Sequence, residues 1–134
     1  MYRRLQSLQG RFISYFYGEA IYGSVPTLVL SEIIGQTLDD LTMKHGDDKE
    51  FERKLEEVYK ALTMYGVTHE DPKLDNTIDV GNCIMIFDLE QCTIEEMNWK
   101  GSTNKGSAGY LLRRLQSNRQ CEDEERQREE KRRD

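Results

Sequence analysis

The chain has no long hydrophobic run, no secretory signal and only three cysteines. None of its 134 residues lies in an apolar stretch of the roughly eighteen residues that a membrane span needs. The N-terminal residues also lack the apolar core of a signal peptide. Cys83, Cys92 and Cys121 form no C-x-x-C pair, so free thiols in a reducing compartment are expected rather than a metal site. We therefore expect an intracellular, cytoplasmic protein with no membrane partner.

Positive charge is scarce. Lys and Arg number 19 against 25 Asp and Glu, which gives a net charge of −6 and an isoelectric point of about 5.0. Nucleic-acid-binding domains show the opposite balance because they contact phosphates through basic patches, so no nucleic-acid partner is expected. The length fits one domain. The mean hydropathy of −0.78 is low for a globular domain, and the charged C-terminal segment accounts for much of it.

Apolar periodicity predicts one clear helix. The apolar residues from Phe51 to Tyr65 recur at steps of four and three positions, which is the spacing of one helix face. Asp47 or Asp48 is a suitable N-cap, and Gly66 is a C-terminal stop. A shorter helix is predicted at 37–43, with a threonine cap and two aspartates in its first turn.

Composition divides the chain into three parts. Residues 1–98 carry most of the apolar side chains and should form the folded domain. Residues 99–109 are rich in Gly, Ser, Thr and Asn, which predicts a flexible linker. Residues 110–134 begin with a helical pattern and end in mixed charges with pairs such as Glu122 and Arg126. Pairs at this spacing support a solvated helix, so a charged helical or disordered tail is predicted.

The most informative segment is His69–Asn76, which reads His-Glu-Asp-Pro-Lys-Leu-Asp-Asn. Asp71 is followed five residues later by Asn76 and, a further dozen residues on, by Asp88. Two aspartates and an asparagine are the side chains that a phosphotransferase needs to orient a hydroxyl and hold Mg²⁺. Two strand-like runs around Gly81 predict a hairpin, and such a hairpin would return Asp88 to the side of Asp71 and Asn76.

This segment resembles the catalytic loop of eukaryotic protein kinases, whose pattern is H-R-D-x-K-x-x-N. The run Ile-Phe-Asp-Leu-Glu around Asp88 resembles the metal-binding D-F-G segment, and the whole chain resembles divergent fungal kinase-like proteins. The resemblance implies ATP and Mg²⁺ as cofactors, with Asp71 as catalytic base and Lys73 on the transferred phosphate. Asn76 and Asp88 would hold the metal. His69 would be a packed structural residue, and Lys73 is typical of the serine/threonine branch.

The resemblance extends upstream and implies an α+β, partial protein kinase-like fold over residues 1–98. Residues 27–33 resemble the last small-lobe strand running into the hinge, with residues 12–17 as the preceding strand and 1–8 as the tail of a small-lobe helix. Leu30 would lie near the gatekeeper position. Glu32 and Ile34 would mark the two ends of the hinge segment whose backbone contacts the adenine.

Several kinase motifs do not occur in this sequence. It contains no G-x-G-x-x-G loop, no V-A-I-K lysine with its partner glutamate and no A-P-E motif, although active kinases need the lysine–glutamate pair. Glu70 stands in place of the usual arginine, and Leu89 and Glu90 replace Phe and Gly. Impaired serine/threonine phosphotransfer is therefore expected. The alternatives are a catalytically inactive, pseudokinase-like module that binds a partner chain, and a small-molecule phosphotransferase of the aminoglycoside or choline kinase type. Without the helices that usually support the catalytic loop of a kinase, apolar surface is expected to be exposed behind this loop.

Overall fold

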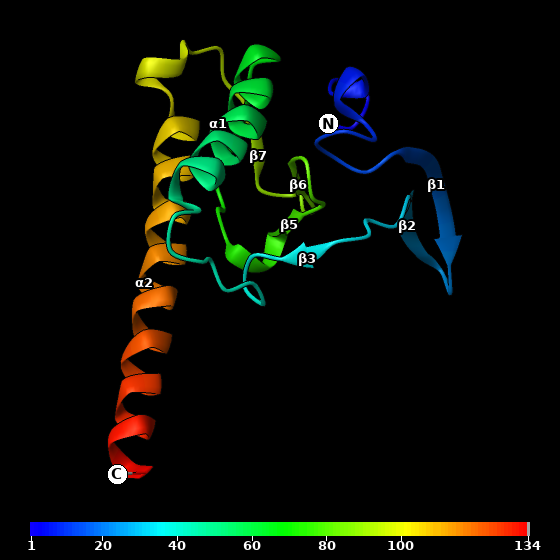
Figure 1. The fold of residues 1–134 in the computed structure, drawn as a ribbon. Helices are drawn as coiled ribbons and strands as arrows, with labels where there is room; N and C mark the ends of the chain where they lie inside the picture. Colours follow the sequence, from blue (N-terminus) through cyan, green and yellow to red (C-terminus); the bar gives the residue numbers. More distant parts are fainter. Residues whose placement is uncertain (134) are drawn as a thin grey trace.

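The computed structural model describes residues 1–133, and its two helices and small antiparallel sheets make the fold α+β (Figure 1). Helix α1 (Asp48–Met64) packs along the first turns of helix α2 (Thr103–Arg133). The strands are β1 (Phe16–Tyr22), β2 (Val25–Leu30), β3 (Gln36–Thr37), β4 (Val67–His69), β5 (Thr77–Asp79), β6 (Ile84–Ile86) and β7 (Cys92–Ile94). They pair as β1-β2, β3-β5-β6 and β4-β7. Short 3-10 helical turns lie at Gln6–Leu8, Leu74–Asn76 and Trp99–Gly101.

The helix predicted before the central motif is confirmed. In α1, Leu55, Val58 and Leu62 have no exposed surface, because they share the face that packs against the sheets and α2. The backbone N–H of Gly66 donates to the carbonyl of Thr63 at 3.0 Å, and Gly66 has a φ of 68°. A positive φ favours glycine over other residues. The helix therefore ends where the sequence indicated and leads directly into β4.

The short helix predicted for residues 37–43 is wrong. Thr37 belongs to β3 and pairs with Ile78 of β5. The backbone N–H of Leu38 then donates to the carbonyl of Thr77 at 2.9 Å, and the Leu38 side chain is fully buried. Sheet pairing thus satisfies the backbone groups that a helix would have needed. Local propensity for a capped helix is too weak to compete with a buried strand contact.

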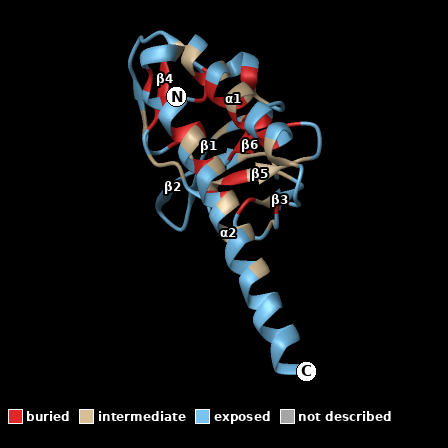
Figure 2. Cartoon of the chain, turned by 60° about the vertical axis from the view of Figure 1, so that its left-hand side comes forward, coloured by how far each residue is buried: buried red, intermediate tan, exposed pale blue. Residues whose placement is uncertain are grey.

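The flexible linker predicted for residues 99–109 is also wrong. Residues 99–101 form a helical turn and α2 begins at Thr103. Ser102, Asn104, Ser107 and Ala108 are buried, because small side chains let the start of α2 approach α1 and β4 closely. The charged tail is helical as far as Arg133. Figure 2 shows that burial stops about midway along this helix and that the rest projects into solvent.

The free end of α2 should add little to stability. Residues 127–133 are exposed, whereas Gln116 and Arg119 nearer the body both hydrogen-bond Asp48 of α1. Deleting residues 127–134 should therefore change the free energy of unfolding by less than about 0.5 kcal/mol in urea titrations. Deleting residues 116–134 should lower the free energy of unfolding clearly more. Equal losses of stability for the two deletions would contradict the conclusion that the free end of α2 adds little.

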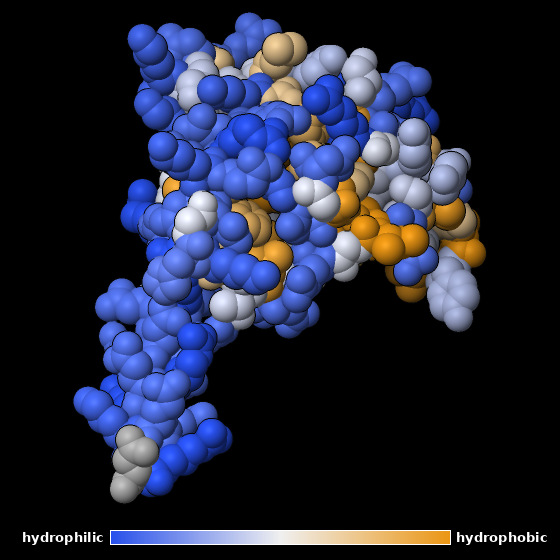
Figure 3. Space-filling model, viewed as in Figure 1, coloured by the Kyte–Doolittle hydropathy of each residue, from blue (hydrophilic) through white to orange (hydrophobic). Residues whose placement is uncertain are grey.

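The β1–β2 hairpin stands apart from the body of the molecule (Figure 1). Ile21 is 80% exposed and Tyr22 is 82% exposed, and Figure 3 shows apolar surface gathered on this side. Apolar surface is therefore exposed on the β1–β2 hairpin rather than behind the motif loop, where α2 packs against β4. The strand expected at 27–33 is present as Val25–Leu30. The strand expected at 12–17 begins only at Phe16, and residues 1–8 form turns and a 3-10 turn rather than the end of an α-helix.

The predicted hairpin after the motif is confirmed as β5 and β6. Ile78 pairs with Met85, and the N–H of Val80 donates to the carbonyl of Cys83 at 3.1 Å. Gly81 in the turn has a φ of 109°, which favours glycine. Within residues 1–133, no helix combines the length and the apolar character needed to cross a bilayer.

Candidate functional site

His69 ties the two predicted motif segments together. Its side chain is fully buried, and its Nε2 donates to the backbone carbonyl of Asp88 at 2.8 Å. Because a carbonyl only accepts, Nε2 carries a proton in this contact, and Nδ1 lies 3.5 Å from the Tyr59 hydroxyl. The prediction of a packed structural histidine is confirmed. The ring fixes the position of the backbone at Asp88 relative to β4.

The β5–β6 hairpin brings Asp88 back toward Asn76. Thr77 pairs with Ile86, and one residue further out the N–H of Phe87 donates to the carbonyl of Asn76 at 2.9 Å. Asp88 is therefore adjacent to the residue that pairs with Asn76. The hairpin thus brings together two segments that are separated by a dozen positions in the sequence.

A buried ion pair holds this hairpin against α1. Nζ of Lys54 lies 3.2 Å from Oδ1 of Asp79, and the two side chains are 8% and 15% exposed. The same carboxylate oxygen accepts the N–H of Gly81 at 3.1 Å. Lys54 therefore ties the middle of α1 to the turn that sets the direction of β6 and hence of Asp88. Sequence reasoning did not identify this pair, because the two residues are distant in the chain and each has the composition of an ordinary surface position.

Asp71 and Lys73 lie together in the loop after β4. Nζ of Lys73 is 3.4 Å from Oδ2 of Asp71, with Lys73 58% exposed and Asp71 33% exposed. An ion pair with this exposure contributes little to stability, so it leaves both side chains free to rearrange around a ligand. Without a ligand, Lys73 thus contacts the carboxylate of Asp71. The resemblance to protein kinases assigns this carboxylate as the proton acceptor.

One of the two oxygens of the Asp88 carboxylate is hydrogen-bonded to the local backbone. Its Oδ1 accepts the N–H of Glu90 at 2.9 Å, and no hydrogen bond from residues 1–133 reaches its Oδ2. Its charge acts on nearby groups. The pKa of Tyr2 is raised by burial first and by Asp88 next, and the same two causes raise the pKa of Cys92 to about 12. Asp88 is therefore a centre of negative potential beside the β1–β2 hairpin.

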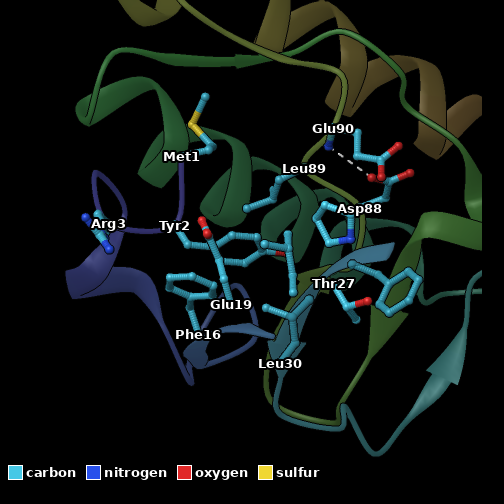
Figure 4. A pocket seen from close by; sticks show the side chains of 13 residues that line it. Met1, Tyr2, Arg3, Phe16, Glu19, Thr27, Leu30, Asp88, Leu89 and Glu90 are labelled. Atoms are coloured by element: carbon cyan, nitrogen blue, oxygen red, sulfur yellow. Dashed lines mark hydrogen bonds between the residues drawn. The ribbon is translucent and has the colours of Figure 1, made fainter. Parts of the chain in front are cut away.

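A cleft of about 830 Å³ separates the β1–β2 hairpin from residues 87–90 (Figure 4). Its lining residues are Met1, Tyr2, Arg3, Phe16, Glu19, Pro26, Thr27, Leu28, Leu30, Phe87, Asp88, Leu89 and Glu90. Of the predicted site residues, the cleft brings together only Leu30 and Asp88. Arg3 is the only basic side chain in this lining.

The remaining predicted residues do not line this cleft. Asp71, Lys73 and Asn76 lie in the neighbouring loop, with Lys73 at a separate depression of about 220 Å³. Glu32 is exposed, and Ile34 is 83% exposed beyond the end of β2. The predicted adenine-contacting segment is thus an open strip rather than the wall of an enclosed pocket.

The donor set around Asp88 fits Mg²⁺ in chemistry. Within residues 1–133, no three His, Cys, Asp or Glu side chains gather as a metal cage. Magnesium instead commonly takes one or two protein oxygens and completes its shell with water and phosphate. The free Oδ2 of Asp88 and the side-chain oxygen of Asn76 are hard ligands of that kind. Of the two residues only Asp88 lines the cleft, and the contact that links them is the backbone bond from Phe87 to Asn76. An ion held by both side chains would also need a phosphate-bearing ligand.

Sequence reasoning also missed Asn104, although a signal was present. Its Oδ1 accepts the N–H of His69 at 3.0 Å, and its Nδ2 donates to the carbonyl of Val67 at 2.8 Å and to the Thr63 hydroxyl at 2.9 Å. Asn104, Ala108, Leu111 and Leu115 recur at helical spacing. The Ser102 hydroxyl accepts the N–H of Lys105 at 3.2 Å, as an N-cap does. Glycines and serines in the same window masked that pattern.

Neither a scan against protein-family models nor a search of curated proteins finds a match to this chain.

Proposed function

We propose that this chain is a protein kinase-like module that binds Mg·ATP at Asp88 and Asn76 and has an impaired capacity to transfer phosphate to serine or threonine hydroxyls. The observation that carries this proposal is the bond from Nε2 of His69 to the carbonyl of Asp88. Together with the contact from Phe87 to Asn76, it fixes the motif loop beside the segment that carries Asp88.

Each residue has a distinct role in this proposal. The carboxylate of Asp88 and the amide oxygen of Asn76 hold the metal, and bound Mg²⁺ supplies charge neutralisation for the nucleotide phosphates. Asp71 accepts the proton of the attacking hydroxyl. Lys73, which pairs with Asp71 in the free chain, moves to the transferred phosphate. His69 is a positioning residue that acts through the backbone of Asp88.

The composition of the cleft supports the impairment. Its lining contains three carboxylates and one guanidinium, and it contains no lysine. Phosphoryl transfer depends almost entirely on positioning and on cationic stabilisation of the phosphates. With so little positive charge at the cleft, a nucleotide depends on its magnesium ion for binding, and Arg3 is the single basic side chain of the lining that could assist it.

Calorimetric titration of ATP into the purified chain tests this proposal. We expect binding that requires Mg²⁺ and disappears in EDTA. Asp88→Asn keeps the Oδ1 that accepts the Glu90 N–H but removes the charge, so it should weaken Mg·ATP binding at least tenfold, or about 1.4 kcal/mol. Asp75→Asn, at an exposed position in the 3-10 turn Leu74–Asn76, is the matched control. Equal binding by the Asp88→Asn and Asp75→Asn variants would overturn the assignment.

A catalytically inactive binding module is the second candidate, and the absence of a lysine from the cleft lining favours it. The two candidates differ in one readout. Incorporation of labelled phosphate into a serine/threonine substrate, lost in Asp71→Asn, supports the enzyme. Mg·ATP binding without any incorporation supports the inactive module. The small-molecule phosphotransferase reading is disfavoured by Lys73, which that branch usually lacks.

A further inference from the structure

The cleft beside Asp88 has an apolar wall made by one face of the β1–β2 hairpin. Phe16 pairs with Leu30, and Glu19 pairs with Leu28 across the two strands. Tyr2 stacks on Phe16 with ring centroids 5.5 Å apart. Figure 4 shows Phe16 and Leu30 on one side of the cleft and Asp88 and Glu90 on the other. The cleft therefore has two walls from distant parts of the chain.

Negative charge exceeds positive charge around this cleft. Glu19, Asp88 and Glu90 line it with three carboxylates, against the guanidinium of Arg3. None of the three carboxylates takes part in an ion pair within residues 1–133. Their charges are thus available to a ligand.

The same carboxylates act on a neighbouring titratable group. The pKa of Tyr2 is raised by burial first, then by the charge of Asp88 and, among smaller causes, by Glu90. A phenol becomes harder to ionise where the local potential is negative. The field that Asp88 and Glu90 create therefore reaches the aromatic wall formed by Tyr2 and Phe16.

We propose that this cleft binds an organic cation with an apolar, aromatic body. The volume of about 830 Å³ falls within the range of small-molecule pockets, which are mostly apolar with a few converging polar groups. The ring of such a ligand would lie against Phe16, Leu28 and Leu30. Its ammonium group would face Glu19 and Glu90, and aromatic faces also attract cations. This inference concerns the cleft that contains Asp88 of the proposed nucleotide site, but it does not depend on nucleotide binding.

An isosteric ligand series tests the inference in EDTA, so that no Mg²⁺ competes for Asp88. Tryptamine, tryptophol and indolepropionate share one indole body and carry a positive, a neutral and a negative end. In calorimetric titrations we expect tryptamine to bind at least tenfold more tightly than tryptophol, and indolepropionate to bind most weakly. Equal binding of amine and alcohol, no binding of tryptamine, or preference for the carboxylate would overturn the proposal.

Two variants and one control locate the ligand on the protein. The double variant Glu19→Gln with Glu90→Gln should remove the preference for the amine while leaving tryptophol binding unchanged. Glu32→Gln, which removes an exposed carboxylate outside the cleft lining, should keep that preference. Leu28 is 50% exposed, so Leu28→Arg should weaken tryptamine binding without unfolding the chain. Circular dichroism verifies the fold of each variant. An unchanged tryptamine affinity in the double variant would contradict the assignment.

Discussion

Replacing Asn104 with alanine should lower the free energy of unfolding by about 3 kcal/mol. The side chain is buried and makes three hydrogen bonds, to the N–H of His69, the carbonyl of Val67 and the hydroxyl of Thr63. Its removal leaves the N–H of His69 and the carbonyl of Val67 inside the protein without this partner. An unsatisfied buried polar group costs about 1–3 kcal/mol, and the loss of packing adds to that cost.

Urea titrations monitored by circular dichroism measure this effect. Asn118→Ala is the matched control, because Asn118 is a partly exposed asparagine on the same helix, and this change should cost less than about 0.5 kcal/mol. If Asn104→Ala were as mild as the control, α2 would not be attached to β4 through this side chain. The start of the helix would then behave as the linker that composition suggested.

Replacing Lys54 with methionine should cost about 3 kcal/mol, because it leaves a largely buried carboxylate without its cation. Nζ of Lys54 lies 3.2 Å from Asp79, and both side chains are mostly shielded from water. Methionine retains most of the apolar part of the lysine side chain, so the loss of stability reflects chiefly the removal of the charge. Lys49→Met, at an exposed position of the same helix, should change stability by less than about 0.5 kcal/mol.

A second substitution separates the unpaired charge from the loss of packing. Asp79→Asn in the Lys54→Met background removes the stranded carboxylate but retains an Oδ1 to accept the N–H of Gly81. This double variant should recover at least about 1 kcal/mol relative to Lys54→Met alone. If stability falls further instead, the buried pair is not what joins α1 to the hairpin.

The elements that could be predicted from the sequence are those whose signals are local. The helix ending at Gly66 and the hairpin turning at Gly81 each combine regular apolar spacing with a glycine at a position of positive φ. Residues 37–43 contain a local helix signal as well, but the pairing of Thr37 with Ile78 overrides it. That contact spans some forty residues, and no local pattern encodes it.

The candidate site divides in the same way. The hairpin that returns Asp88 to Asn76 was foreseeable from turn chemistry. The cleft was not, because its walls are residues 1–3, the β1–β2 hairpin and residues 87–90, whose proximity depends on tertiary packing. Glu32 and Ile34 were assigned by resemblance to an adenine-contacting segment, yet their side chains are exposed. Their predicted role therefore depends on backbone groups.

A thermal melt of the purified chain with and without Mg·ATP tests the central proposal most directly. Ligands that bind only the folded form raise its melting temperature. We predict a rise of the melting temperature in Mg·ATP that is absent with ATP in EDTA, absent in Asp88→Asn and retained in Asp75→Asn. An unchanged melting temperature in Mg·ATP, or an equal rise in the Asp88→Asn variant, would contradict a nucleotide site at Asp88 and Asn76.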